Sequence, residues 1–328
     1  MATPPLRIPR RAVLAAAALG TTATGALAQQ PAWPSRPVRI IIPFAPSGGA
    51  DTFTRLMTEP LAAALGQPFV VENRPGGGGV IGTDAAAKAA PDGHTLLMLT
   101  VTLTANETLM PNRPYVLLRD LAPVASLNRT LQVLVVNPAM PVNTVAELVA
   151  WAKARPGQLD YATAGPGTPY HIAFELFRHM AGIQVQHIPF RLSGDARNAV
   201  VGGQVPAMFD GIATMLPLIR AGRVRALATT GTERSSLMPE TPTVAETLPG
   251  YEQVGFNGLL APAATPRAIV ERLNAEINRI IATDAIRDAF SRLGAEIAPM
   301  SPDAFGDALR ADIERRREWI NLAGIQPQ

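Results

Sequence analysis

The sequence contains no cysteine among its 328 residues. A chain without cysteine forms no disulfide bond, no thiolate metal site and no catalytic thiol, so an oxidising compartment is compatible with it but is not indicated by it. No stretch after residue 28 approaches the ~20 apolar residues that a membrane-spanning helix needs. We therefore expect the chain after residue 28 to be soluble.

Signatures of enzymes and of cofactor sites are also missing. The histidines, which are His94, His171, His179 and His187, lack a metal-ligand spacing such as His-Glu-x-x-His. No Gly-x-Ser-x-Gly elbow is present. The tetraglycine at 76–79 lacks both the Gly-Lys-Ser/Thr ending and the spaced glycines of nucleotide-binding loops. We predict a protein that is not an enzyme and has no metal or other cofactor, and we assign the tetraglycine a structural role.

The N-terminal segment accounts for the excess of basic residues. Arg7, Arg10 and Arg11 precede an apolar run at 12–19, and small residues follow it. This pattern predicts a secretory signal peptide at 1–28 that is cleaved after its last residue. The adjacent arginines fit both the twin-arginine and the Sec route. Removing three arginines and no acids from 29 basic and 26 acidic residues leaves 26 of each, which gives no electrostatic reason to bind nucleic acid or a membrane.

Short apolar runs alternate with segments of helical spacing. The strand-like runs lie at 38–42, 69–71, 96–99, 133–136, 159–162, 185–188 and 224–228. They are mostly apolar rather than alternating, which is typical of buried parallel strands, so we predict an α/β fold with a mainly parallel sheet. Pro60 is expected to kink or interrupt the first helix, because it lacks an N–H group and crowds the preceding turn.

The length of the chain favours two domains, because about 300 residues exceed what one core usually organises. The sequence from Pro266 onward is strongly helical, with a last helix around 304–320. Helices of this kind commonly pack back on the first domain of a two-lobed protein. We therefore predict a discontinuous first domain at 29–130 plus 254–328, and a second domain at 131–253.

Two turns of similar sequence carry the functional prediction. Residues 44–51 (FAPSGGAD) and 164–171 (AGPGTPYH) each follow a strand-like run and lead into a helix-like one. Their small residues let backbone N–H groups turn outward at a helix start, where an anion binds readily. Two such turns, far apart in the chain, indicate one ligand that is held by two domains.

The residues that cap the following helices differ between the two turns. Asp51 is expected to cap a helix that begins directly after it, since its charge would repel a bound anion. Thr168 is expected to be an N-cap with Pro169 at the first helical position, which leaves the N–H groups of Tyr170 and His171 for a ligand. The His171 ring either donates a hydrogen bond to the ligand or is tied to a nearby carbonyl.

Further motifs follow in a fixed order along the chain. They lie at 43–51, 71–76, 81–82, 91–96, 165–168, 171, 175–177, 202–205, 208–210, 225–228, 242–246 and 259–262. Taken together they resemble the Bug family, the periplasmic substrate-binding components of tripartite tricarboxylate transporters. The resemblance covers nearly the whole chain after the signal peptide.

The resemblance implies a two-lobed periplasmic-binding-protein fold, type II-like, that closes on a small carboxylate without a cofactor. It also implies delivery of this ligand to the membrane permease subunits of a tripartite tricarboxylate-type transporter. We expect a periplasmic monomer that binds no nucleic acid. Carried over by position, the ligand-binding residues are Phe44, Ala45, Ser47, Gly48, Gly49 and Asp51 in the first turn, Ala164, Gly165, Gly167, Thr168 and His171 in the second, and Thr102 and Asp210 near the cleft.

Some positions depart from the usual pattern of the family and are expected to set specificity. Ser47 stands where glycine is common, and Arg191 stands where lysine is familiar. Thr102, Leu103 and Tyr170 also flank the glycines. Backbone N–H groups bind a carboxylate whatever the rest of the molecule is, so these neighbours are expected to select the ligand. Dicarboxylates, tricarboxylates, aromatic acids and amino acids all stay open.

Two other functions share part of this pattern. A periplasmic module that presents a bound carboxylate to a sensor kinase would use the same residues, so only its genetic context separates it from a transport receptor. A secreted hydrolase would need an activated nucleophile, and the sequence offers none.

Overall fold

The computed structural model describes Met1 and residues 33–46, 49–166, 168–322 and 324–327. Residues 2–28 of the predicted signal peptide and the turn residues Ser47, Gly48 and Gly167 lie outside the described residues. Residues 34–328 form one compact unit. No helix in the described ranges is long and apolar enough to cross a membrane.

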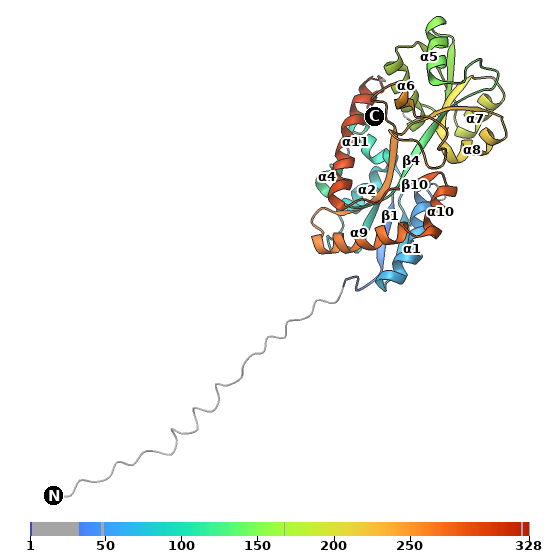
Figure 1. Cartoon of the computed structure of the whole chain (residues 1–328). Coiled ribbons are helices and arrows are strands. Elements are labelled where there is room, and N and C mark those ends of the chain that lie inside the picture. The colour runs from blue at the N-terminus through green and yellow to red at the C-terminus, as the bar shows by residue number, and fades with distance from the viewer. Residues whose placement is uncertain (2–32, 47–48, 167, 323, 328) are drawn as a thin grey trace. The chain divides into compact units, whose positions relative to one another are not determined.

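The compact unit alternates strands and helices (Figure 1). The strands are β1 (Val38–Ile42), β2 (Phe69–Asn73), β3 (Thr95–Leu99), β4 (Leu121–Val136), β5 (Leu159–Thr163), β6 (Val185–Pro189), β7 (Ala207–Gly211), β8 (Arg225–Thr229), β9 (Val254–Pro262) and β10 (Ala295–Ile297). The α-helices are α1 (Gly49–Leu65), α2 (Val80–Ala87), α3 (Val101–Leu109), α4 (Leu117–Asp120), α5 (Val145–Ala154), α6 (Pro169–Ala181), α7 (Ser193–Val201), α8 (Ile212–Arg220), α9 (Arg267–Ile281), α10 (Asp284–Arg292) and α11 (Pro302–Leu322). Each strand-like run of the sequence overlaps one of these strands, and the helical C-terminal region is confirmed.

The strands form one mixed sheet in the order β2-β1-β3-β9-β4-β7-β5-β6, with β8 and β10 also paired to β4. β1 is parallel to β2 and β3, and β5 is parallel to β6 and β7. We call these two parallel groups, with the helices around them, the first and the second lobe. β9 and β4 join the lobes by antiparallel pairing. The expectation of a mainly parallel sheet is therefore wrong, because it left out β9 and most of β4.

Helix α1 buries one face in the first lobe. Phe53, Met57 and Leu61 are at most 5% exposed, and the Phe53 ring meets Phe290 of α10 edge to face at 5.1 Å between centroids. The helix continues through Pro60 to its end. The expected interruption is absent because the buried residues on both sides of the proline hold the two halves of the helix in place.

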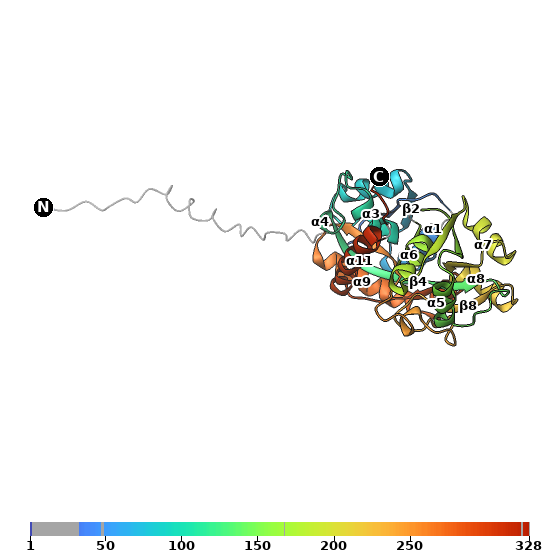
Figure 2. The same cartoon turned by 90° about the horizontal axis from the view of Figure 1, so that it is seen from above.

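The second lobe has helices on both faces of its sheet, and Figure 2 shows α7 and α8 on the side away from α3 and α4. Phe174 and Phe177 of α6 meet Phe209 of β7 edge to face in one core. Ala199 of α7 and Met215 of α8 belong to the core on the opposite face. Burying each large apolar side chain stabilises the lobe by about 1.5–3 kcal/mol.

The long strand β4 passes through both lobes. Its residues 121–131 pair with β9, and its residues 132–136 pair with β7 and β8. The change of partner therefore falls between Leu131 and Gln132. The pairing with β9 has two register shifts, and bulges of this kind bend a strand.

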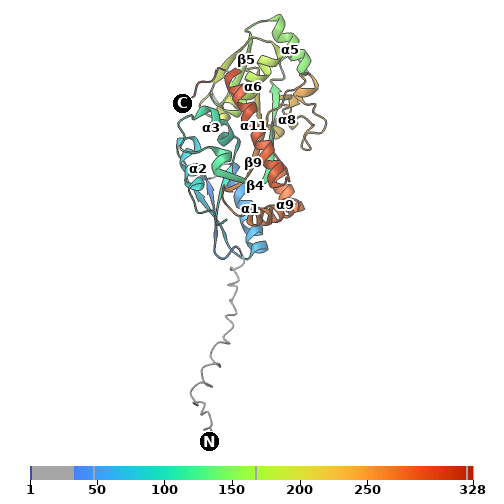
Figure 3. The ribbon, with the colours of Figure 1, turned by 90° about the vertical axis from the view of Figure 1, so that its left-hand side faces the viewer.

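Helix α11 contacts both lobes, and Figure 3 shows it running from the level of α6 to that of α9. Phe305 and Leu309, near its start, pack in a core of the first lobe. Trp319 and Ile320, near its end, pack with α6 in a core of the second lobe. The last helix therefore packs on both lobes rather than on the first alone.

A buried ion pair fixes α11 to its neighbours. The side chains of Arg316 and Asp312 are 1% and 2% exposed, and Nε of the arginine lies 2.8 Å from Oδ2 of the aspartate. Thr104 of α3 donates a hydrogen bond to the same oxygen over 2.6 Å. Nη2 of Arg316 donates to the carbonyl of Val254, the first residue of β9, over 3.0 Å. The pair thus joins α3, β9 and α11 at the point where the chain returns to the first lobe.

Candidate functional site

Helix N-termini gather at the carboxyl ends of the parallel strands. In the first lobe α1 follows β1 and α3 follows β3, and in the second lobe α6 follows β5 and α8 follows β7. Parallel strands end at a common edge, so the N–H groups of these helix starts lie together at one edge of each lobe. Exposed N–H groups at a helix start attract anions. Both predicted turns occupy such positions, before α1 and before α6.

The shape of the first turn is held by Asp51 and Asn73. The helix begins at Gly49, so Asp51 lies inside its first turn rather than before it. The Asp51 carboxylate is buried and accepts hydrogen bonds from Asn73 Nδ2 over 3.0 Å and from Arg55 Nε over 2.9 Å. Asn73 Nδ2 also donates to the carbonyl of Phe44 over 3.1 Å. The expected N-cap role of Asp51 is therefore wrong, because this aspartate links the helix to β2.

The tetraglycine turn lies against the first predicted turn. Gly79 has a φ of 99°, and a Cβ atom there would lie 3.0 Å from Leu103 and 3.2 Å from the half-buried Phe44 ring. Only glycine adopts this positive φ readily and also leaves the space that Leu103 and Phe44 occupy. Asn106 of α3 donates to the Gly78 carbonyl over 2.9 Å. The turn therefore packs Phe44 onto α3, which is the structural role that the sequence predicts.

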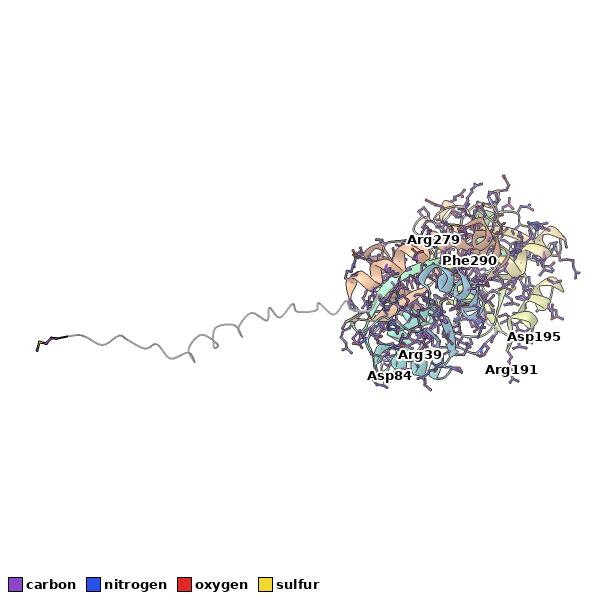
Figure 4. All side chains as sticks on the ribbon, turned by 90° about the horizontal axis from the view of Figure 1, so that it is seen from below. Arg39, Asp84, Arg191, Asp195, Arg279 and Phe290 are labelled. Carbon is purple, nitrogen blue, oxygen red and sulfur yellow. The ribbon has the colours of Figure 1, made fainter. Side chains whose placement is uncertain are left out.

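The residues expected to set specificity have different exposures. Leu103 is fully buried in the core of the first lobe, so its side chain is not exposed at the surface of the site. Thr102, beside it, is half-buried in the first turn of α3, and Ala45 is exposed. Arg191 is exposed, and Figure 4 shows it at the edge of the second lobe near Asp195.

The second turn has the predicted cap. Thr168 is the N-cap of α6, and Pro169 is its first residue. Thr168 Oγ1 accepts a hydrogen bond from the His171 N–H over 3.3 Å and donates one to the Gly165 carbonyl over 2.8 Å. The cap thus uses the N–H of His171, which we had expected to be available to a ligand. The N–H of Tyr170 has no acceptor in the described part of the chain.

The backbone of the residues before this cap is held in place by burial and by a hydrogen bond within the turn. Ala164 and Gly165 are half-buried, and Gly165 has a φ of 110°. The N–H of Gly165 donates to Thr163 Oγ1 over 3.0 Å, so it is also used within the turn. Among the described residues of the second turn, the N–H of Tyr170 thus stays without an acceptor.

His171 lies in a column of stacked rings. Its ring centroid is 4.3 Å from that of His187, which lies 4.9 Å from Tyr161. Burial, together with the nearby His187, lowers the pKa of His171 to about 4. The imidazole is therefore neutral near pH 7, with one nitrogen that donates and one that accepts.

Asp210 positions the Tyr170 side chain. The carboxylate is fully buried at the end of β7, and it accepts from Arg197 Nε over 2.9 Å and from the Gly211 N–H over 2.7 Å. Tyr170 also hydrogen-bonds to it, and burial together with this carboxylate raises the pKa of the tyrosine. The Asp210 carboxylate is therefore held by other protein groups, namely Arg197, Gly211 and Tyr170.

A cavity of about 120 Å³ lies where α3, α6, β4 and β9 meet. It is lined by Val101, Thr130, Leu131, Gln132, Pro169, Tyr170, Gly211, Gln253 and Gly255. Sequence reasoning singled out Tyr170 but missed Thr130, Gln132 and Gln253. The available signal was the polar pair Thr130 and Gln132 directly before the apolar run at 133–136. In the ranges that the structure describes, no group of three or more His, Cys, Asp or Glu side chains is placed to hold a metal ion.

Comparison with known proteins adds a family and a set of relatives. Residues 53–324 match the TctC family, described as "Tripartite tricarboxylate transporter family receptor". BugT of Bordetella pertussis is 37% identical over 297 residues, which cover 90% of this chain and 91% of BugT.

Two solved structures are similar over most of the chain. An R. palustris protein solved with adipate has a TM-score of 0.74 and 32% identity, covering 90% of this chain and 100% of that one. A TctC solute-binding protein from Polaromonas, solved without ligand, has a TM-score of 0.81 and 27% identity, covering 88% of this chain and 99% of that one.

Proposed function

Because the chain belongs to the receptors of the tripartite tricarboxylate transporter family, we propose that it captures a small carboxylate between its lobes and delivers it to the permease subunits of such a transporter. The predicted resemblance to the Bug proteins and the two-lobed α/β binding-protein fold are confirmed. Members of this family are periplasmic receptors rather than enzymes. We propose that this chain acts in the periplasm as a monomer after residues 1–28 are removed.

The observation that carries the proposal is the start of α6. Its Tyr170 N–H has no acceptor in the described part of the chain, and Tyr170 lines a cavity between the lobes. A helix start also favours a bound carboxylate. The proposed ligand-binding residues are Phe44, Ala45, Ser47, Gly48, Gly49, Asp51, Thr102, Ala164, Gly165, Gly167, Thr168, His171 and Asp210. Asp51 and Asp210 are proposed to act through the residues that they position, because protein groups occupy their carboxylates.

We place the hinge at the crossings between the lobes, with domains at 29–130 plus 254–328 and at 131–253. The change of partner within β4 supports the first boundary, and the hydrogen bond from the Gln253 N–H to the Thr230 carbonyl, directly before β9, supports the second. The TM-score is higher with the ligand-free relative than with the adipate-bound one despite the lower identity. Lobes that stand open, without a ligand between them, would make this structure more similar to the ligand-free relative than to the adipate-bound one.

A thermal-shift screen of small carboxylates tests the binding role. A ligand that binds the folded protein alone stabilises it by about 2.7 kcal/mol at a hundredfold excess over Kd, which we expect to raise the Tm by roughly 5 °C. Methyl esters of the same acids are the controls, since they lack the charge that the helix start favours. The binding role is contradicted when dicarboxylic, tricarboxylic, aromatic and amino acids all leave the Tm unchanged.

Delivery to a transporter is tested separately, by deleting the gene and measuring uptake of the ligand, which should be lost. The similar proteins give no support to the alternative in which the chain presents its ligand to a sensor kinase.

Removing the cap of α6 is expected to affect both folding and binding. Thr168→Ala should lower the free energy of unfolding by about 1 kcal/mol and weaken carboxylate binding by about fivefold, because the Tyr170 N–H loses its fixed direction. Thr144→Ala is the matched control, since Thr144 caps α5 through the Glu147 N–H over 3.1 Å. Urea unfolding and calorimetry should show a similar loss of stability in both variants and weaker binding in Thr168→Ala alone. Equal affinities of the two variants would argue against a ligand at the start of α6.

A further inference from the structure

We propose that the cavity at the junction of the lobes selects a carboxylate whose second polar group is uncharged, such as a hydroxyl, carbonyl or amide, and that Gln132 binds this group. The inference rests on the proposed function and specifies its ligand. It concerns the part of the cavity that β4 forms, which lies outside the two glycine turns.

The lining of the cavity is neutral. None of its described lining residues is an arginine, lysine, histidine, aspartate or glutamate. A second carboxylate placed here would lose its hydration without gaining a cation, and an ammonium group would lose its hydration without gaining an anion. Nearby Asp210 does not change this charge balance, because it is fully buried and paired with Arg197. An uncharged polar group therefore costs least to bury in this cavity.

The side-chain amide of Gln132 has no protein partner among the described residues. The residue is only 9% exposed, and Oε1 of its side chain has no hydrogen-bond partner in the described part of the chain. Its backbone is fixed, since its N–H donates to Thr230 Oγ1 over 2.9 Å and its carbonyl accepts from the Thr230 N–H over 3.0 Å. Leaving a buried polar group unpaired costs about 1–3 kcal/mol. A ligand that pairs with this amide recovers part of that cost.

The other polar groups of the lining are already engaged. The Tyr170 hydroxyl is engaged by the Asp210 carboxylate. Thr130 Oγ1 donates to the Gly255 carbonyl over 3.4 Å, and Gln253 Nε2 lies 3.5 Å from the Pro169 carbonyl. Among the described polar side chains of this lining, Gln132 is therefore the one that makes no hydrogen bond to the protein. Its amide both donates and accepts, so it accommodates a hydroxyl, a carbonyl or an amide.

The position of Gln132 fits a ligand that spans two contacts. Pro169 and Tyr170, at the start of α6, line the same cavity as Gln132 on β4. A carboxylate bound at the Tyr170 N–H directs the rest of a short ligand toward the strands. The change of strand partner at Leu131 and Gln132 lies in this part of the cavity, so the second polar group contacts the crossing between the lobes.

Calorimetry on the mature chain, residues 29–328, with matched ligands tests this inference. Succinamate and 4-hydroxybutyrate carry an uncharged polar group, succinate carries a second carboxylate, and butyrate carries none. We expect the two neutral polar ligands to bind at least about tenfold more tightly than succinate. In Gln132→Leu, their affinity should fall by at least about tenfold while that of butyrate stays within about threefold. Gln158→Leu, at an exposed position before β5 and at the opposite end of that strand from α6, should leave all affinities unchanged.

A second variant keeps the test valid if leucine disturbs folding. Gln132→Glu preserves the shape and adds a negative charge, so we expect it to lose succinamate binding and to gain binding of 4-aminobutyrate. Tighter binding of succinate than of succinamate by the unmodified protein would overturn the inference and leave the proposed function standing. Unchanged ligand preferences in both Gln132 variants would also overturn it. A protein that binds no carboxylate of any kind would overturn both.

Discussion

Replacing Arg316 by methionine is expected to lower the free energy of unfolding by about 3–5 kcal/mol. The substitution keeps much of the side-chain volume but leaves the Asp312 carboxylate buried without its cation, since that group is 2% exposed. It also removes the hydrogen bond to the Val254 carbonyl. The expected loss is large because the cost of burying an unpaired charge exceeds the net value of an intact pair.

Urea unfolding of the purified mature chain measures this effect. Arg310→Met is the matched control, because Arg310 pairs with Asp307 on the same helix at 2.9 Å but both side chains are well exposed, and exposed pairs contribute little. The double variant Asp312→Leu with Arg316→Met should recover much of the loss, since it removes both charges. Similar stabilities for Arg316→Met and Arg310→Met would show that the buried pair does not stabilise the junction of α3, β9 and α11.

Stability is expected to fall by about 3 kcal/mol as the pH decreases from about 6.5 to about 4, because His171 stays neutral in the folded protein. In the unfolded chain the imidazole binds a proton near pH 6.5, whereas burial and the neighbouring His187 keep the folded pKa at about 4. The unfolded state therefore binds more protons within this window and is favoured as the pH falls. Above about pH 6.5 both states are neutral, and this contribution is constant.

The variant His171→Gln should show a shallower decrease in stability over the same pH window. The pKa of His187 is also lowered by burial, so part of the decrease remains in the variant. His179→Gln is the control, since His179 is exposed on the same helix. Parallel pH profiles for the unmodified protein and His171→Gln, measured by chemical denaturation at each pH, would contradict the assignment of a neutral buried imidazole.

The strands that the sequence predicts share a property that the missed ones lack. Val38–Ile42 and the other predicted strands contain short, mostly apolar runs, so composition alone identifies them. Most of β4 was missed because Ser126 and Asn128 are polar and yet fully buried within the strand. Their burial depends on pairing with β9, which is more than a hundred residues away in sequence. The local sequence around Ser126 and Asn128 therefore does not indicate that β9 is their partner.

The same distinction applies to the candidate site. Thr168 and Pro169 form the predicted cap because capping is decided within four residues. The role of Asp51 was misassigned because its partner, Asn73, comes from the next strand. Gln132 was missed because its proposed role depends on a cavity that residues of α3, β4, α6, β7 and β9 enclose. Local chemistry was therefore predictable, whereas the contacts that decide what a ligand meets were not.

The place of β9 in the sheet also constrains the order of folding. Residues 254–262 lie between β3 and the long strand β4, although they are made after the whole second lobe. Until they are present, β3 has an unpaired edge, and the first lobe lacks both the strand that joins it to β4 and helix α11. We therefore expect a chain that ends before residue 254 to remain unfolded in its first lobe. The two lobes should then be completed together, in one cooperative step, once the last quarter of the chain is available.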